Sequence, residues 1–258
     1  MIRFIPRLFV AIALLGLFTS SSQATDLIQI TKDNYDKVVP KGKEIDAIYG
    51  DWVLRNDKVC AVIANPTPGR KANMTVRGVG GMLIDFTTRF SGSDQLSCFY
   101  PAGGRYIFEQ ADNFGIQSGE EILPLDETPS VSQESITVVV TGKPLSGDDT
   151  VAAVRYSLAE DQAFLAYSAE LINEGKKESQ LRIMDSLRCD GDLFKTGDLD
   201  GAFIAEDVYF GQCYLFTIED HDIKKTGGRN MELQTVKNEK LVVPAGESLT
   251  WNGKVICA

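Results

Sequence analysis

Apolar and polar positions alternate along much of the chain after residue 50. In ESITVVVTG, the side chains of Ile136, Val138 and Val140 fall on one face. The stretch QAFLAYSAELIN repeats this pattern from Leu165 to Leu171. Because a period of two residues is typical of β-strands that bury one face, both stretches predict long strands that pack on a core.

Short apolar segments recur at intervals of about ten residues, separated by glycine, proline, asparagine and aspartate. This spacing predicts an all-β chain, a large antiparallel β-sandwich with at most short helices. One short helix is expected at 34–38, before Pro40 stops it. Asn252-Gly253 is expected to form one of the turns. The predicted strands are 52–54, 59–64, 82–87, 96–100, 136–141, 151–158, 164–173, 180–187, 202–210, 213–218, 241–243 and 248–255.

The N-terminal segment has the features of a secretory signal peptide. Arg3 and Arg7 precede an apolar stretch at 8–18, which a small, polar segment ending in Ala24 follows. The apolar stretch is shorter than the roughly 20 residues of a membrane-spanning helix, which disfavours the alternative of an uncleaved anchor. We therefore expect a signal peptide at 1–24, export to the periplasm or the extracellular space, and a single β-sandwich domain at 25–258.

Charge and composition narrow the classes of partner. The chain has 36 acidic and 26 basic residues, a net charge of −10, and loss of Arg3 and Arg7 with the signal peptide would lower it to about −12. Phosphate backbones and anionic membranes are poor partners for such a surface. We expect no nucleic-acid partner and, after signal cleavage, no membrane partner.

The cysteines do not form a metal-binding pattern. The five lie far apart with no CxxC pair, and the chain has one histidine, so we expect neither a zinc site nor another cofactor. Export permits a disulfide, for which Cys189 with Cys213 is the preferred pair because they lie on successive predicted strands. The alternative is that the cysteines are small buried apolar residues.

The stretch VRGVGGMLIDFTTR raises the question of a phosphate-binding loop. Such a loop needs a helix after its glycines, whereas Gly78, Gly80 and Gly81 precede a β-branched and aromatic run. We interpret these glycines as turn or bulge residues that lead into a strand.

Two polar stretches are candidates for chemistry. His221 lies among charged neighbours in EDHDIKK, which favours a solvated loop residue over a base or a metal ligand. The stretch CDGDLFKTGDLDG, 189–201, has four aspartates among glycines, a composition that suits calcium, but it does not match an EF-hand loop. A polar hairpin is the favoured interpretation.

Asp185 shares a predicted strand face with Leu181, Ile183 and Leu187. A carboxylate on an apolar face must be paired or hydrogen-bonded. It is then either a structural acceptor or part of a ligand pocket.

The run at 40–89 resembles the N-terminal region of large secreted bacterial proteins, common in planctomycetes, whose C-terminal part is a metallohydrolase of the polymerase-and-histidinol-phosphatase type. The resemblance rests on GKEIDAIYGD, LRNDKV, ANMTVR and GGMLIDFTTR. It implies a module that docks against a secreted hydrolase partner. The hydrolase itself would need many histidine and aspartate ligands, which this chain lacks.

The run at 150–187 is similar to the hairpin of galactose-mutarotase-like supersandwich domains, in which an Asn-x-Gly turn joins two long strands. The similarity implies a large antiparallel sandwich able to bind carbohydrate. Mutarotases work with paired histidines and a glutamate, and this chain has one histidine. The resemblance therefore supports the fold and not the epimerase activity.

Two functions follow from the sequence. The first is a secreted non-catalytic β-sandwich module that binds a saccharide or docks to a hydrolase partner; the alternative is a carbohydrate-active enzyme, of epimerase, lyase or glycoside hydrolase type, that uses Asp and Glu residues alone. The candidate ligand-binding residues are Asn73, Arg77 and Asp185, and we expect no catalytic residue. Alternatively, Arg77 pairs with Asp185 or Asp85 and ties two sheets together.

Export should remove residues 1–24, because the basic start, the short apolar stretch and the small residues before Thr25 form one signal. Mass spectrometry of secreted protein should find Thr25 at the N-terminus, and retention of Met1 would contradict the prediction.

Overall fold

The computed structural model describes residues 24–90, 92–104, 106–109, 114–125, 130–144, 149–189, 194–227, 231–237 and 239–258. The predicted signal peptide lies outside the described residues except for Ala24, and so do Asp190 and Asp192 of the acidic stretch. Cleavage after Ala24 therefore stays a prediction.

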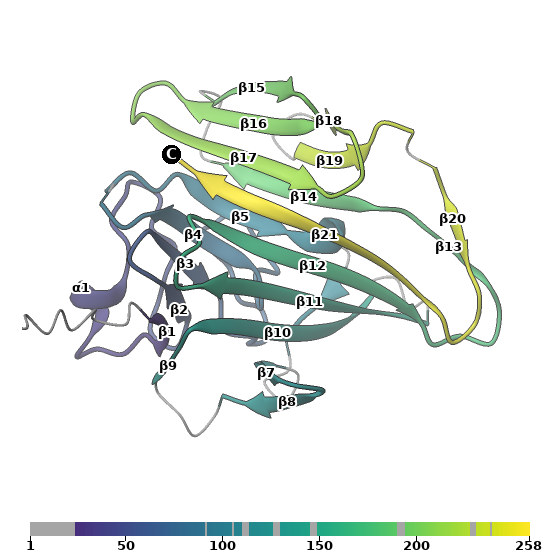
Figure 1. Ribbon diagram of the computed structural model, residues 1–258, viewed down its shortest axis with the longest axis horizontal. Helices are drawn as coiled ribbons and strands as arrows, with labels where there is room; N and C mark the ends of the chain where they lie inside the picture. Colours follow the sequence, from purple (N-terminus) through teal and green to yellow (C-terminus); the bar gives the residue numbers. More distant parts are fainter. Residues whose placement is uncertain are drawn as a thin grey trace, which may run out of the picture.

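The chain is nearly all β, and two large antiparallel sheets form a sandwich, which confirms the predicted fold class (Figure 1). In the described part of the chain, the first sheet has nine strands. Their spatial order is β18 (Ile223–Thr226), β19 (Met231–Thr235), β14 (Met184–Cys189), β5 (Leu96–Tyr100), β4 (Leu83–Thr88), β3 (Val59–Ile63), β2 (Trp52–Arg55), β1 (Thr25–Gln29) and β9 (Ser130–Gln133).

The second sheet has ten strands within the same described residues. Their order is β15 (Phe194–Leu199), β16 (Ala202–Asp207), β17 (Gln212–Ile218), β21 (Ser248–Cys257), β12 (Phe164–Asn173), β11 (Thr150–Ala159), β10 (Ser135–Pro144), β7 (Phe114–Ser118) and β8 (Glu121–Pro124), with β6 (Tyr106–Ile107) paired to β10.

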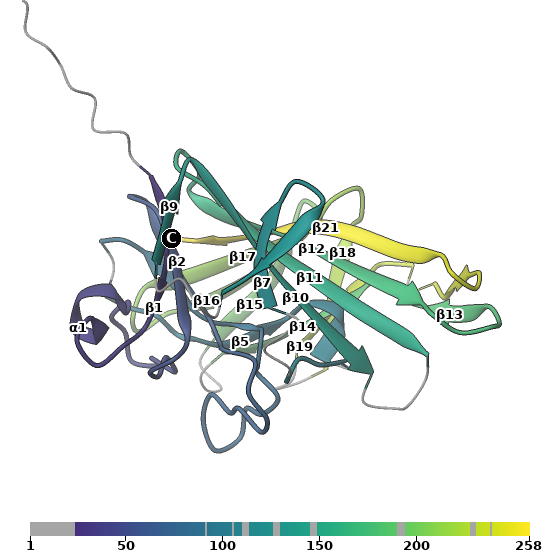
Figure 2. The ribbon, with the colours of Figure 1, turned by 90° about the horizontal axis from the view of Figure 1, so that it is seen from below.

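Three smaller elements complete the fold. Strands β13 (Ser179–Leu181) and β20 (Leu241–Val243) form a two-stranded ribbon. It lies at the end of the sandwich opposite the helix α1 (Tyr35–Val38) (Figure 2). The helix predicted at 34–38 is confirmed, and a 3-10 turn, η1 (Pro101–Gly104), follows β5. Among the described residues, no helix has the length and apolar character needed to cross a bilayer.

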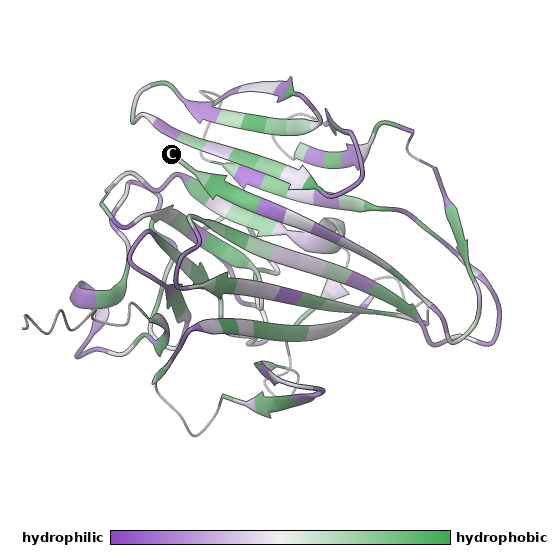
Figure 3. Ribbon diagram, viewed as in Figure 1, coloured by the Kyte–Doolittle hydropathy of each residue, from purple (hydrophilic) through white to green (hydrophobic). Residues whose placement is uncertain are grey.

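Apolar side chains from both sheets fill the space between them. Ile136, Val138 and Val140 are all at most 1% exposed, as the alternation predicted. The ring of Phe99, from the nine-stranded sheet, lies 4.9 Å from the ring of Tyr167 in the ten-stranded sheet, centroid to centroid. Figure 3 shows apolar residues concentrated in the strands and hydrophilic residues in the connecting loops.

The strand predicted at 180–187 is divided in the structure. Its first residues belong to β13 and its last to β14, and neither strand pairs with β12. The free edge of β12 is taken by β21, so the chain crosses after Asn173 from the ten-stranded sheet to the nine-stranded one. The long hairpin expected from the resemblance at 150–187 is therefore wrong, because β21, from much later in the sequence, pairs with β12 where the strand at 180–187 was expected to pair.

The turn predicted at Asn252-Gly253 is also wrong, because both residues lie inside β21. Gly253 is paired with Tyr167 across the sheet. A Cβ on Gly253 would lie 2.4 Å from an edge carbon of the Tyr167 ring and 2.2 Å from the carbonyl oxygen of Thr217. The glycine therefore marks a close approach rather than a change of chain direction.

The preferred disulfide is not formed, and all five cysteines are free. Cys189 pairs with Leu96 in the nine-stranded sheet, whereas Cys213 pairs with Glu206 in the ten-stranded sheet. Cys189 ends β14 and Cys213 lies in β17, so β15 and β16 separate the two cysteines in the sequence, and their strands belong to different sheets.

Gly253→Ala should destabilise the fold by roughly 2 to 3 kcal/mol, since the added methyl group has no space between Tyr167 and β17. Gly197→Ala is the matched control, because a Cβ there meets no atom within 4 Å; it should change the free energy of unfolding by less than about 0.5 kcal/mol. Urea unfolding measures both, and equal effects would contradict the prediction.

Candidate functional site

The glycines of the sequence VRGVGGMLIDFTTR form a turn. Gly78 and Gly81 have φ angles of 65° and 71°, which favour glycine. Gly81 donates its N–H to the carbonyl of Ala64 at 2.7 Å, and β4 follows directly. The interpretation as turn residues before a strand is confirmed.

Asn73 and Arg77 lie in the loop before this turn. The Oδ1 of Asn73 accepts hydrogen bonds from the backbone N–H groups of Thr75 at 3.0 Å and Val76 at 3.1 Å, so its side chain stabilises its own loop. The side chain of Arg77 is exposed. Its carbonyl accepts a hydrogen bond from the Tyr100 hydroxyl at 3.0 Å. The loop is thus fixed by its backbone, while the guanidinium of Arg77 faces solvent.

Asp185 is fully buried and hydrogen-bonded, as predicted for a carboxylate on an apolar face. It accepts from the N–H of Ala102 at 3.0 Å, the hydroxyl of Tyr167 at 2.6 Å, and the indole of Trp251 at 3.2 Å. Burial raises the pKa of Asp185 to about 6, while these three donors act in the opposite direction. Because Tyr167 and Trp251 belong to the other sheet, Asp185 connects the two sheets.

Arg77 does not pair with Asp185 or Asp85 among the ion pairs of the described residues. Asp85 instead accepts the N–H of Asp46 at 2.7 Å. The expected tie between sheets thus exists, but neutral donors make it in place of an arginine. Four hollows of about 150 to 400 Å³ in the described part of the chain are lined by none of Asn73, Arg77 and Asp185.

A buried ion pair that the sequence reasoning missed lies in the segment with the bacterial resemblance. Arg70 and Asp51 are 2.6 Å apart, with side chains 6% and 1% exposed. Asp51 also accepts the N–H groups of Ile48 at 2.9 Å and Asn65 at 2.8 Å. It therefore holds three loop segments together, which is a structural role.

Two further carboxylates, Asp85 and Asp94, are fully buried. Burial raises the pKa of both well above the usual range. Asp94 accepts from the N–H of Phe86 at 2.7 Å and the hydroxyl of Tyr214 at 3.1 Å. Within the described residues, no three acidic, histidine or cysteine side chains lie close enough to hold a metal ion.

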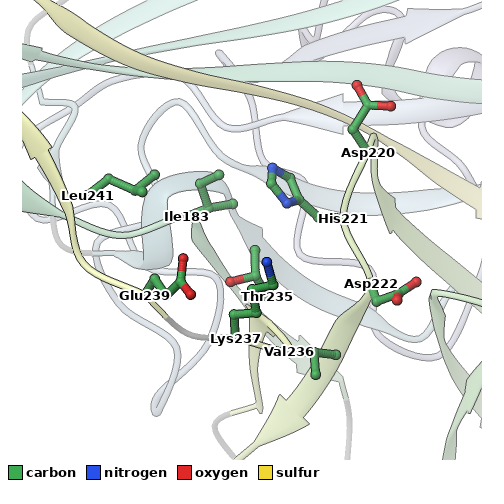
Figure 4. Close-up of a pocket in the computed structure, with 9 residues that line it drawn as sticks. All are labelled: Ile183, Asp220, His221, Asp222, Thr235, Val236, Lys237, Glu239 and Leu241. Atoms are coloured by element: carbon green, nitrogen blue, oxygen red, sulfur yellow. The ribbon is translucent and has the colours of Figure 1, made fainter.

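A cleft of about 400 Å³ lies where the ribbon of β13 and β20 meets both large sheets (Figure 4). Its wall combines charged and polar side chains with an apolar part. The residues that line it are Ile183, Asp220, His221, Asp222, Thr235, Val236, Lys237, Glu239 and Leu241. Cavities of about 300 to 1,000 Å³ are the usual size for small-ligand sites.

Backbone hydrogen bonds fix the turn that carries His221. The N–H of His221 donates to the carbonyl of Ile218 at 3.3 Å, and Asp220 has a φ of 61° in this turn. The N–H of Val236 donates to the carbonyl of Asp222 at 2.9 Å, which ties the turn to the end of β19. The cleft is therefore built on elements from both sheets.

The side chains of His221 and Glu239 point into the cleft, whereas those of Asp220 and Asp222 point away from it (Figure 4). His221 is exposed on a turn, as predicted. Its contribution to a cavity was not foreseen, because Ile183 and Glu239 come from distant parts of the sequence. The cleft thus offers an imidazole and a carboxylate beside an apolar surface.

The described part of the acidic stretch forms a hairpin. Strands β15 and β16 pair across Asp200 and Gly201, so a hairpin is present, but residues 194–199 form a strand where the favoured interpretation was a polar loop. Asp200, Asp220 and Asp222 line a separate hollow of about 360 Å³ next to the cleft. The calcium interpretation depends also on Asp190 and Asp192, which lie outside the described residues.

No family model matches the chain, and no curated protein matches it either. A solved TPR-domain containing protein from Parabacteroides distasonis is similar, with 14% identity and a TM-score of 0.50 over 81% of this chain and 47% of that one. This chain thus spans about half the length of that protein. The likeness shows a shared fold and no more.

Two other solved structures are similar at lower scores. A galactose mutarotase-like protein from Clostridium acetobutylicum has a TM-score of 0.47 and 11% identity, covering 84% of this chain and 98% of that one. The alpha-galactosidase from Lactobacillus brevis has a TM-score of 0.47 and 11% identity, covering 81% of this chain and 39% of that one.

The ionisation of Asp185 should make stability depend on pH. Its pKa is raised in the folded state from 3.8 to about 6, so unfolding releases a proton between these values and stability falls as the pH rises through them. Asp185→Asn removes this fall. Relative to the original chain, the variant should gain about 3 kcal/mol between pH 4 and pH 7.

Chemical unfolding at pH 4, 5, 6 and 7 measures this gain. Other buried carboxylates cancel in the comparison, because both proteins contain them. Asp161→Asn, at an exposed position, is the control. Its free energy of unfolding should change with pH by the same amount as that of the original chain. The prediction would be contradicted if the free energy of unfolding of Asp185→Asn had the same pH dependence as that of the original chain.

Proposed function

We propose that the chain is an exported, non-catalytic β-sandwich module that binds a neutral saccharide in the cleft of His221 and Glu239. The observation that carries the proposal is the lining of this cleft, in which polar groups and an apolar surface lie within about 400 Å³. A carboxylate accepts hydrogen bonds from sugar hydroxyls, and imidazole can accept or donate one. Ile183 and Leu241 offer apolar surface to the C–H groups of a sugar ring.

Charge favours a neutral ligand over an acidic one in this cleft. Three carboxylates, those of Asp220, Asp222 and Glu239, are near it, against the one ammonium group of Lys237. An anionic sugar would meet repulsion from these carboxylates. Docking to a secreted hydrolase partner remains an alternative proposal, based on the resemblance of 40–89, and Asn73 and Arg77 remain its candidate binding residues.

A second candidate is an enzyme that uses acid–base chemistry on a sugar, because an imidazole and a carboxylate point into one cavity (Figure 4). The version with carboxylates alone has less support, since Asp220 and Asp222 point away from the cleft. Turnover of an oligosaccharide that both His221→Ala and Glu239→Gln abolish would favour the enzyme over the binding module.

Glycan-array screening of the mature chain, followed by calorimetry on the neutral sugars it retains, tests the binding proposal. His221→Ala and Glu239→Gln should each weaken binding about tenfold, the loss of one hydrogen bond to a polar partner. Both side chains are exposed, so the melting temperature should not change. Glu178→Gln, at another exposed glutamate, should leave binding unchanged.

Arg77→Ala separates the two candidate sites. If Arg77→Ala abolishes binding and the cleft variants retain it, the saccharide binds at the loop that contains Asn73 and Arg77 and not in the cleft. Absence of binding to every neutral sugar would overturn the proposal.

A further inference from the structure

A second hollow, of about 300 Å³, lies beside α1 and the end of β4. Three cationic residues line it, Lys37 from α1, Lys41 from the loop that follows and Arg89 from the end of β4, against one carboxylate, Asp36. The whole chain has the opposite balance, with 36 acidic and 26 basic residues. Positive charge is therefore in excess in the lining of this hollow.

The charge of these residues is not neutralised within the described part of the protein. The ion pairs there use Lys43, Arg55, Lys58, Arg70, Arg155 and Lys254. Lys37, Lys41 and Arg89 take part in none of them, and all three are exposed. Three cations against the single carboxylate of Asp36 in one lining give the hollow a positive potential that attracts an anion.

The backbone around the hollow is held in place. The carbonyl of Lys41 accepts the N–H of Asp94 at 3.2 Å, and the N–H of Arg89 donates to the carbonyl of Lys58 at 2.8 Å. Gly42 packs so closely on Asp94 that an added Cβ would lie 2.3 Å from the nitrogen of Asp94. The segments that carry the cations are thus positioned before any ligand binds, which lowers the entropic cost of binding.

The remaining lining suits an anion that is attached to a larger group. Thr87 and Thr88 add hydroxyl-bearing side chains. Burial raises the pKa of the Cys60 thiol to about 12, so this group remains neutral at ordinary pH. Phe90 also lines the hollow, and this residue is 92% exposed. An exposed aromatic ring beside cations offers an apolar surface to whatever carries the charge.

We propose that this hollow binds the carboxylate or sulfate group of an acidic saccharide, with Lys37, Lys41 and Arg89 as charge partners and Phe90 against the sugar ring. Arginine and lysine bind oxyanions through charge-assisted hydrogen bonds. The site is separate from the cleft of His221 and Glu239, because no residue lines both, and α1 lies at the end of the sandwich opposite the ribbon that carries Leu241 (Figure 1). The proposal for this hollow is therefore independent of the proposal for the neutral-sugar site.

Calorimetry of the mature chain at constant ionic strength tests the proposal with two probes, sodium sulfate and a disaccharide that contains glucuronic acid. The double variant Lys41→Ala/Arg89→Ala should weaken binding of both probes at least tenfold. Phe90→Ala should weaken binding of the disaccharide alone. The double variant Lys176→Ala/Lys195→Ala, at two exposed lysines away from the hollow, removes the same number of charges and should change neither.

Three results would overturn the proposal. The first is unchanged binding of both probes in Lys41→Ala/Arg89→Ala. The second is an equal loss in Lys176→Ala/Lys195→Ala, which would indicate general charge attraction. The third is a disaccharide affinity that Phe90→Ala does not alter, which would reduce the ligand to a free oxyanion. Glu239→Gln should leave both probes unaffected, and this separates the test from that of the cleft.

Discussion

The relation of the two sheets depends on buried carboxylates with donors in the opposite sheet: Asp94 has one, Tyr214, and Asp185 has two. Asp185 stands in the nine-stranded sheet and accepts hydrogen bonds from Tyr167 and Trp251 of the ten-stranded sheet and from Ala102 of η1. Apolar contacts alone tolerate small sliding movements, whereas a carboxylate without its donors in such a core is costly. The three donors therefore define which strands of the two sheets face each other.

The crossing of the chain after Asn173 connects the fold to the cleft. The side-chain amide of Asn173 donates to the carbonyls of Lys177 at 2.8 Å and Val243 at 2.9 Å, so one residue fixes both segments of the ribbon. The ribbon then delivers Ile183 and Leu241 to the rim of the cleft. The apolar part of the candidate site thus results from the same crossing that divides the predicted strand.

The sequence predicts those parts of the fold that depend on local pattern. Strands β5, β12 and β20 have the predicted bounds, because strong apolar runs end at clear turn residues. Strands β8, β9 and β15 were missed, because they are mostly exposed edge strands without an apolar face. Strands β1, β7, β18 and β19 were missed as well, although each has buried residues, because they are short. The cleft was missed for another reason. Ile183, His221 and Glu239 are separate in the sequence and meet only through pairing between distant strands.

The position of β21 has a consequence for the order of folding. A nascent chain can pair β10 with β11 and β12, and β15 with β16 and β17, as soon as each hairpin has emerged. The two groups share no edge until β21 enters between β12 and β17. Before that step both strands present open edges to other chains, so the large sheet closes late and partly synthesised molecules are the aggregation-prone species.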